Sequence, residues 1–233
     1  MSAYLYHEKE NCQDCSDISC AATKLSGEEL DHLHLNSRET TYRRGEIIIR
    51  EGTLNSHIIY LKSGLVKEFI RTDQNEEQIV SIVKKHSYLG LSSLFGDKIN
   101  HYSYSALENV IVCNIDVETF LKMVKTNGVF AFEILKTVSK DSLNNFHRFM
   151  VLSHKKMYGR IADSILYFSD IIYEKQDFTL PFSRKELAEL VGISRESATR
   201  VLLKFHEEGI LDLSGKKITI KNRDLLQQIS KNG

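Results

Sequence analysis

The sequence predicts an α+β protein in which a β-rich segment, a long helix and a helix-turn-helix with a β wing follow one another. The first observation is a series of short β-prone runs within residues 38–116, separated by turn residues. The second is a helical stretch over residues 129–152 that contains neither proline nor glycine. The third is a pair of short amphipathic helices that begins after Ser183 and turns at Gly192.

Length and composition are those of an ordinary globular protein. The 233 residues suffice for two small domains, and 42% of them are hydrophobic and 27% charged. No run approaches the ~18 apolar residues of a membrane span, and the first ten residues lack the apolar core of a signal peptide. We therefore expect a cytoplasmic protein without a membrane partner, in which disulfides are rare.

Four cysteines form the most informative group of side chains. Cys12, Cys15 and Cys20 lie together near the start, and Cys113 lies in a β-prone run. Four thiolates are the number that a tetrahedral zinc ion or an iron–sulfur cluster requires. Two alternatives remain open: Cys113 is a small buried apolar residue, or the first three cysteines bind zinc together with a histidine such as His7.

The β-rich segment follows a short helix that Ser26 caps, with Glu29 in the position of a capping box. Gly, Asn, Asp and Ser separate the predicted strands. Many short strands with regular turns indicate a sandwich or barrel. The predicted strands are Glu46–Arg50, His57–Lys62, Leu65–Arg71, Gln78–Val83, Tyr102–Leu107 and Val110–Ile115.

The long helix carries two apolar stripes. One repeats at alternating steps of four and three residues, the spacing of a helix that pairs with a second copy. It predicts a homodimer interface through Leu135, Val138, Ser142, Asn145, Phe149 and Leu152, starting from Ala131. The second stripe is predicted to lie on the β domain and consists of Phe132, Leu135, Leu143, Phe146 and Met150. The alternative is a single wide core face.

The helix-turn-helix is predicted from its caps and its turn. Ser183 caps the helix over residues 184–191, Gly192 makes the turn, and Ser194 caps a helix that ends near Glu208. Residues 210–220 read as a two-stranded wing. The start of the second helix is the end that meets base edges in such motifs. The predicted DNA-binding residues are Ser183, Ser194, Arg195, Glu196, Thr199, Arg200 and Lys216.

The run from Ser183 to Arg200 resembles the helix-turn-helix of the CRP/FNR family of bacterial transcription regulators. The family's Glu-x-x-Ser-Arg readout is present as Glu196-x-x-Thr199-Arg200, and Arg195 resembles an extra arginine of the cyclic-AMP receptor branch. The resemblance implies a jelly-roll-like β-barrel sensor domain, a long dimerisation helix and a C-terminal winged helix-turn-helix. The implied parts are a cysteine-rich segment 1–25, a sensor domain 26–126, a dimerisation helix 127–153 and a DNA-binding domain 154–233.

The branch is indicated by two stretches of the sensor domain. Where the cyclic-nucleotide branch has a Glu and an Arg that grip ribose and phosphate, this chain has Leu89-Gly-Leu-Ser-Ser93 and Asn100-His-Tyr-Ser103. A cyclic nucleotide would lack its charged clamp and is not expected. The segment around Cys113 and the pair Cys12-x-x-Cys15 are similar to the FNR branch, although four residues separate Cys15 from Cys20 where that branch usually has five.

The resemblance to this branch implies a [4Fe–4S] cluster on Cys12, Cys15, Cys20 and Cys113 that oxygen or another oxidant destroys. It implies a non-enzymatic regulator whose partners are a second copy, RNA polymerase, and double-stranded DNA with inverted TGA-type half-sites. The alternative is a family member that senses a small organic effector in the β domain, with cysteines that are structural, zinc-binding or thiol-redox. The target genes and the choice between activation and repression lie beyond the sequence.

Overall fold

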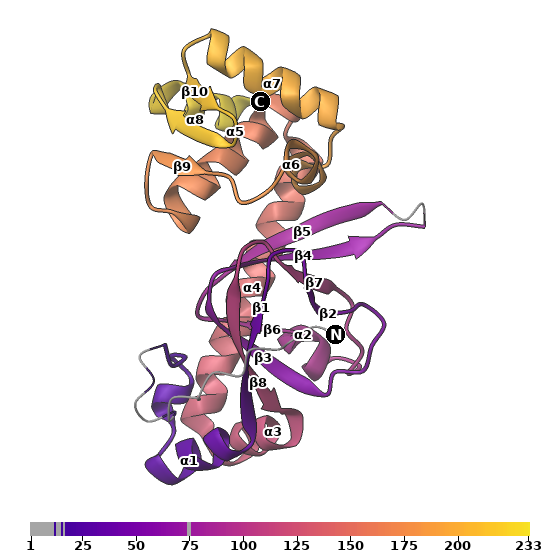
Figure 1. The fold of residues 1–233 in the computed structure, drawn as a ribbon, viewed down its shortest axis with the longest axis vertical. Coiled ribbons are helices and arrows are strands. Elements are labelled where there is room, and N and C mark those ends of the chain that lie inside the picture. Colours follow the sequence, from indigo (N-terminus) through magenta and orange to yellow (C-terminus); the bar gives the residue numbers. More distant parts are fainter. Residues whose placement is uncertain (1–11, 13–14, 16, 74–75) are drawn as a thin grey trace. The chain divides into compact units, whose positions relative to one another are not determined.

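The computed structural model describes residues 12, 15, 17–73 and 76–233 (Figure 1). The described chain divides into two compact units. The first, here called the β unit, comprises the described residues up to Ile70 together with Ser81–Leu143, and the second, the winged unit, comprises Arg71–Val80 and Asn144–Gly233. The four-part division expected from the sequence stays a prediction.

Two antiparallel four-stranded sheets form the sandwich, which confirms the predicted fold class. One sheet has the order β1-β8-β3-β6 and the other β2-β7-β4-β5. The strands are β1 (Ser37–Tyr42), β2 (Ile47–Ile49), β3 (His57–Ser63), β4 (Leu65–Arg71), β5 (Glu77–Lys84), β6 (Ser87–Leu89), β7 (Ser103–Ala106) and β8 (Val110–Asp116). At Gly64, between β3 and β4, φ is +87°, and an added Cβ would lie 2.6 Å from Val110 Cγ1.

Strand β1 was not predicted because its sequence, Ser-Arg-Glu-Thr-Thr-Tyr, lacks apolar alternation. It lies at the edge of its sheet and pairs only with β8 among the described strands. An edge strand that buries little on either face needs no apolar period. The short strand β6 and helix α2 (Leu91–Phe95) were missed as well, since each is too short for a periodic signal.

Three helices pack on one face of the β unit and enclose its larger core. They are α1 (Gly27–Leu35), α3 (Val117–Thr126) and the first half of α4 (Gly128–His154) (Figure 1). The predicted capping box of α1 is confirmed: Ser26 N donates to Glu29 Oε2 at 2.8 Å, and Glu29 N donates to Ser26 Oγ at 3.3 Å. The core joins the single 3₁₀ turn η1 (Ala22–Lys24) to α4 through buried Ala22, Phe120 and Phe130.

Helix α4 presents its apolar stripes differently from the prediction in two respects. Val138, predicted at a dimer interface, packs against the β-unit core beside buried Ile134. The stripe predicted to lie on the β domain is exposed instead. Phe130, Ile134 and Val138 share one helical face at i, i+4, i+8, which rotates the other stripe to solvent. The exposed apolar residues of α4 are Val129, Phe132, Leu135, Leu143, Phe146, Phe149 and Met150.

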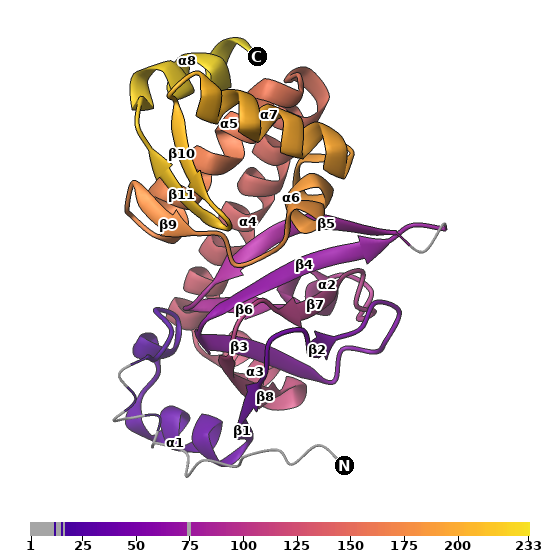
Figure 2. The same ribbon diagram turned by 45° about the horizontal axis from the view of Figure 1, so that its top comes forward.

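The winged unit contains the predicted helix-turn-helix and wing (Figure 2). Helix α5 (Met157–Tyr167) continues into one π-helical turn, η2 (Phe168–Ile172), and packs against the last helix, α8 (Arg223–Asn232). Helices α6 (Arg184–Val191) and α7 (Arg195–Glu207) follow strand β9 (Asp177–Thr179). The sheet order is β10-β11-β9, with β10 (Leu211–Ser214) and β11 (Lys217–Ile220) as the wing.

The described helices include none that is both long and apolar enough to cross a membrane.

One ionisable group gives the β unit a pH-dependent stability. Burial, and secondly the charge of Glu68 on β4, raise the pKa of Asp141 on α4 to about 6. The folded-state pKa is thus above the unfolded value, so ionisation destabilises the fold. The cost is absent below about pH 4 and fully present above about pH 6.

We therefore predict that Asp141→Asn is more stable than the wild type at pH 7.5 and equally stable near pH 4. Because the residue keeps solvent-accessible surface, the gain should be below about 1 kcal/mol. Urea denaturation at both pH values measures it. A difference between the two proteins that is the same at both pH values would contradict the assignment.

Candidate functional site

Cys113 lies in a row of side chains across the first sheet, and the N-terminal cysteine segment is bonded to the same row. Strand register aligns Glu39 with Cys113, Cys113 with Tyr60, and Tyr60 with Tyr88. Paired positions in an antiparallel sheet point to the same face, so Cys113 stands between a carboxylate and two aromatic rings. The two tyrosine rings lie 5.1 Å apart. This face of the sheet also carries the core beneath the N-terminal segment.

A single short hydrogen bond fixes the cysteine segment to this row. Tyr88 Oη and Ser19 Oγ are 2.5 Å apart, and Ser19 Oγ also accepts from Ala22 N at 3.0 Å. Ser19, Ala21 and Ala22 are buried. The segment that carries Cys20 is therefore anchored at the side chain next to the thiol.

The thiols contribute to the raised pKa of each of the two tyrosines. Burial is the main cause that raises the pKa of Tyr60, and the charges of Tyr88, Asp17, Cys15 and Cys20 add to it. Burial likewise raises the pKa of Tyr88, against its bond to Ser19, and Cys113, Cys20 and Cys12 add to the effect. All four sulfur atoms therefore lie within electrostatic reach of one pair of rings.

A cation faces the same site. Lys62 Nζ pairs with Glu39 Oε2 at 2.7 Å, with both side chains mostly buried. Burial would lower the pKa of Lys62, but the bond to Glu39 and the charge of Cys15 raise it, and Lys62 also hydrogen-bonds to Cys15. The site thus combines thiols with a positively charged side chain.

The thiols are not gathered at bonding distance from one centre. All four are recorded as thiols, and the described residues contain no group of three or more His, Cys, Asp or Glu side chains that could hold a metal ion. The predicted cluster therefore stays a prediction, and His7 lies outside the described residues. Sequence reasoning named the four cysteines but missed Tyr60, Tyr88 and Lys62, which only strand register brings to them.

The stretch expected to replace a cyclic-nucleotide clamp is uncharged. Gly90 has φ +83°, and its carbonyl accepts from Asn55 Nδ2 at 2.9 Å. His101 is the one residue between Asn100 and Ser103 that can become positive, and its Nε2 lies 3.0 Å from Asp97 Oδ2. The expectation that no cyclic nucleotide binds here stays a prediction.

Helix α7 presents the predicted base-reading side chains in an open groove of about 650 Å³. Ser194 Oγ caps the helix by accepting from Ser197 N at 3.1 Å. Arg195, Glu196 and Arg200 are exposed, whereas Thr199 is half-buried and donates its hydroxyl hydrogen to Arg195 O at 2.9 Å. The groove is lined by Tyr158, Arg195, Glu196, Thr199, Arg200, Leu203, Lys204 and Glu207.

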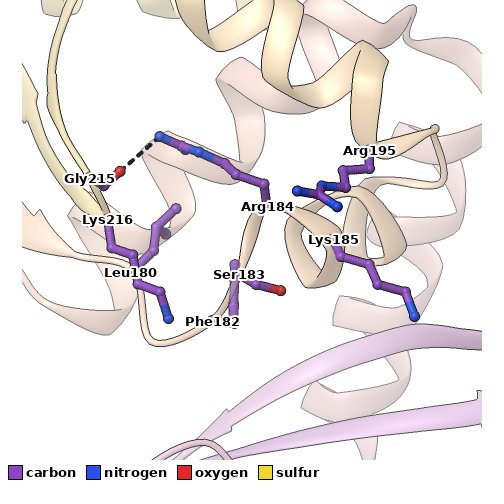
Figure 3. A pocket seen from close by; sticks show the side chains of 8 residues that line it. All are labelled: Leu180, Phe182, Ser183, Arg184, Lys185, Arg195, Gly215 and Lys216. Atoms are coloured by element: carbon purple, nitrogen blue, oxygen red, sulfur yellow. Dashed lines mark hydrogen bonds between the residues drawn. The ribbon is translucent and has the colours of Figure 1, made fainter.

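A second recess of about 350 Å³ lies between α6, α7 and the wing (Figure 3). Its lining includes four cationic side chains, Arg184, Lys185, Arg195 and Lys216, and no carboxylate. Arg184 Nη2 donates to Gly215 O at 3.0 Å and ties the wing to α6, and burial lowers the Arg184 pKa. Such a recess can bind a DNA phosphate. Sequence reasoning missed Arg184 and Lys185, which directly follow the cap.

Ser183 acts first as a helix cap. Its Oγ accepts from Glu186 N at 3.2 Å, and Ser183 N donates to Glu186 Oε2 at 2.8 Å, which completes a capping box. Gly192 adopts φ +65° at the turn to α7, as expected of a helix C-cap. The two caps fix the angle at which α7 is presented.

Comparisons with known proteins agree with this geometry. The family described as a Crp-like helix-turn-helix domain matches residues 159–229, and that described as a cyclic nucleotide-binding domain matches residues 39–127. The transcriptional activator protein FnrA of Stutzerimonas stutzeri is 27% identical over 90% of this chain and 88% of its own length. The fumarate and nitrate reduction regulatory protein of Escherichia coli K12 is 26% identical over 94% and 90%.

Solved structures show the same fold. FixK2 from Bradyrhizobium japonicum superposes with a TM-score of 0.76 at 20% identity, covering 83% of this chain and 96% of its own. A CRP/FNR-family transcriptional regulator from Thermus thermophilus gives a TM-score of 0.69 at 19% identity, covering 84% and 99%.

The readout prediction concerns Arg200. An arginine that grips guanine with two hydrogen bonds is worth ~1–3 kcal/mol of discrimination. Arg200→Ala should therefore relax the preference at one base pair in a binding-site selection. Lys216→Ala is the matched control: loss of one phosphate contact should weaken all sequences alike and reduce the salt slope by about 0.9. A selected motif that stays unchanged in Arg200→Ala would refute the base-reading role.

Proposed function

We propose that this chain, a DNA-binding transcription regulator of the CRP/FNR type, is switched by an oxidant-labile [4Fe–4S] cluster on Cys12, Cys15, Cys20 and Cys113. The observation that carries the proposal is the position of Cys113 beside Tyr60 on one face of the first sheet, with Ser19 of the cysteine segment hydrogen-bonded to the neighbouring Tyr88 at 2.5 Å. The names of the relatives that match most of the chain support it.

The residues present fit such a group. Four thiols supply the full ligand set of a [4Fe–4S] cluster, and Lys62 places a positive charge beside one of them. The buried Tyr60 hydroxyl has no hydrogen-bond partner among the described residues, as expected where a group with acceptor atoms is to be bound. When bound, the cluster would supply redox chemistry that reports an oxidant.

The same core gives the cysteine site a mechanical connection to α4. Neighbouring ring centroids lie 5.1, 5.7 and 5.6 Å apart along the series Tyr60, Tyr88, Phe120 and Phe130, and Phe130 is in the first turn of α4. We infer that ordering of the cysteine segment over Tyr88 stabilises this packing and with it one position of α4.

The exposed stripe of α4 is the proposed homodimer interface. Leu135, Phe146 and Phe149 are each about 60% exposed in the single chain, and large unpartnered apolar side chains on one helix face mark an interaction surface. Ser142 and Asn145 are exposed on this helix as well. Leu152 is half-buried, and Val138 belongs to the core. A dimer would bring two α7 helices onto an inverted repeat, where RNA polymerase is the further partner we propose.

The cluster prediction is tested with protein purified without oxygen. The wild type should contain four iron and four sulfide per chain and absorb in the visible. Cys113→Ser should lose most of both because one of four ligands is absent. Colourless anaerobic wild type, or a full cluster in Cys113→Ser, would rule out the assignment. A zinc content of one per chain would favour a zinc site.

The dimer prediction concerns Phe146 and Ser142. Phe146→Ala removes a 63%-exposed ring, so it should weaken the anaerobic dimer at least tenfold, the equivalent of about 1.4 kcal/mol, and leave chain stability unchanged. Ser142→Leu should strengthen the dimer. Leu35→Ala, at an 80%-exposed leucine on α1, is the matched control. Sedimentation that shows the same dimer strength in all four proteins would contradict the interface.

A further inference from the structure

Two tyrosine hydroxyls lie under the proposed cluster site, but only one has a partner. Tyr88 Oη is bonded to Ser19 Oγ at 2.5 Å. Tyr60 Oη is buried and has no hydrogen-bond partner among the described residues. The residue as a whole is 5% exposed. A buried hydroxyl without a partner is destabilising. The Tyr60 hydroxyl is thus positioned to donate to an acceptor that binds at this site.

The position of Tyr60 limits what that acceptor can be. Strand register places Tyr60 beside Cys113 on the same face of the sheet. The groups whose charges act on its hydroxyl are Tyr88, Asp17, Cys15 and Cys20. Of these, Tyr88 is bonded to Ser19, and Asp17 Oδ1 pairs with His86 Nε2 at 3.2 Å. Both groups already have partners of their own, which favours a sulfur atom as the acceptor.

We propose that Tyr60 donates its hydroxyl hydrogen to a sulfur of the thiolate-bound cluster and thereby tunes its reduction potential. This inference rests on the proposed function, since it requires that a cluster occupies the site. Hydrogen bonds to the sulfurs are among the factors that set the potential of such clusters. A donor stabilises the more electron-rich state, so it raises the potential and slows attack by an oxidant. Tyr60 would hydrogen-bond to the cluster and would not be one of its ligands.

The test compares Tyr60→Phe with the wild type, both purified as full chains without oxygen. The substitution keeps the ring and its packing, so the cluster should load normally. We expect a lower reduction potential and loss of the visible absorbance in air about fivefold faster, the effect of one hydrogen bond of ordinary strength. Fe–S stretching frequencies should shift in D₂O in the wild type, and Tyr60→Phe should lack the part of the shift due to this bond.

Two further measurements separate tuning from a structural effect. Tyr102→Phe makes the same chemical change in the β unit, away from the cysteine row, and should leave the potential and the D₂O shift unchanged. In cluster-free protein, Tyr60→Phe should be at least as stable as the wild type, because it removes an unpaired buried hydroxyl. A role confined to packing predicts the reverse, a loss of stability without a change of potential.

The outcomes distinguish this inference from the proposed function. Wild type that contains no iron and sulfide overturns the proposed function, and the role of Tyr60 with it. Wild type with a full cluster, together with Tyr60→Phe of equal potential, equal decay rate and equal D₂O shift, overturns only the role of Tyr60. A potential lowered in Tyr60→Phe and unchanged in Tyr102→Phe supports both.

Discussion

The packing of Tyr60 and Tyr88 beneath the N-terminal segment is the constraint on which the rest of the β unit depends. The two rings form the base of the cysteine site and also begin the aromatic series that ends at Phe130. Any change that loosens the segment above Tyr88 removes cover from a core shared with α3 and α4. Because close-packed interiors transmit displacement rather than absorb it, a chemical event at the thiols has a direct physical route to the long helix.

The winged unit has its own buried core, which includes Phe168, Phe182 and Phe205. Local bonds position its helix-turn-helix: Ser183 caps α6 with Glu186, Gly192 turns in the left-handed region, and Ser194 caps α7 at Ser197. These local bonds fix α7 relative to α6, and Arg184 fixes the wing through Gly215. A helix-turn-helix that is stabilised by local bonds does not have to refold when the regulator is switched. In the proposed switch, a signal at the thiols changes whether two such DNA-binding units are held together.

The parts that the sequence predicts well are those specified by neighbouring residues. Ser26 with Glu29, Ser183 and Gly192 act through bonds within a few residues, and the structure confirms each. The parts that it predicts poorly depend on distant partners. Val138 was placed on the wrong face of α4, because periodicity gives two stripes but not which of them meets the sandwich. Tyr60 could not be linked to Cys113 without the register of β3 on β8.

The polar interruption of the apolar stripe on α4 affects how strongly two copies of the helix can associate. Exposed Ser142 and Asn145 interrupt the predicted seam between Leu135 and Phe149, so the apolar contact area of a pair of helices is divided. Moving an equilibrium from about 1:99 to 99:1 requires ~5.5 kcal/mol of differential stabilisation. A continuous apolar seam would hold the dimer in every state, and no modest signal could then dissociate it. In the proposed dimer, two polar positions in the middle of the seam would keep the association weak enough for ordering of the cysteine segment to control it.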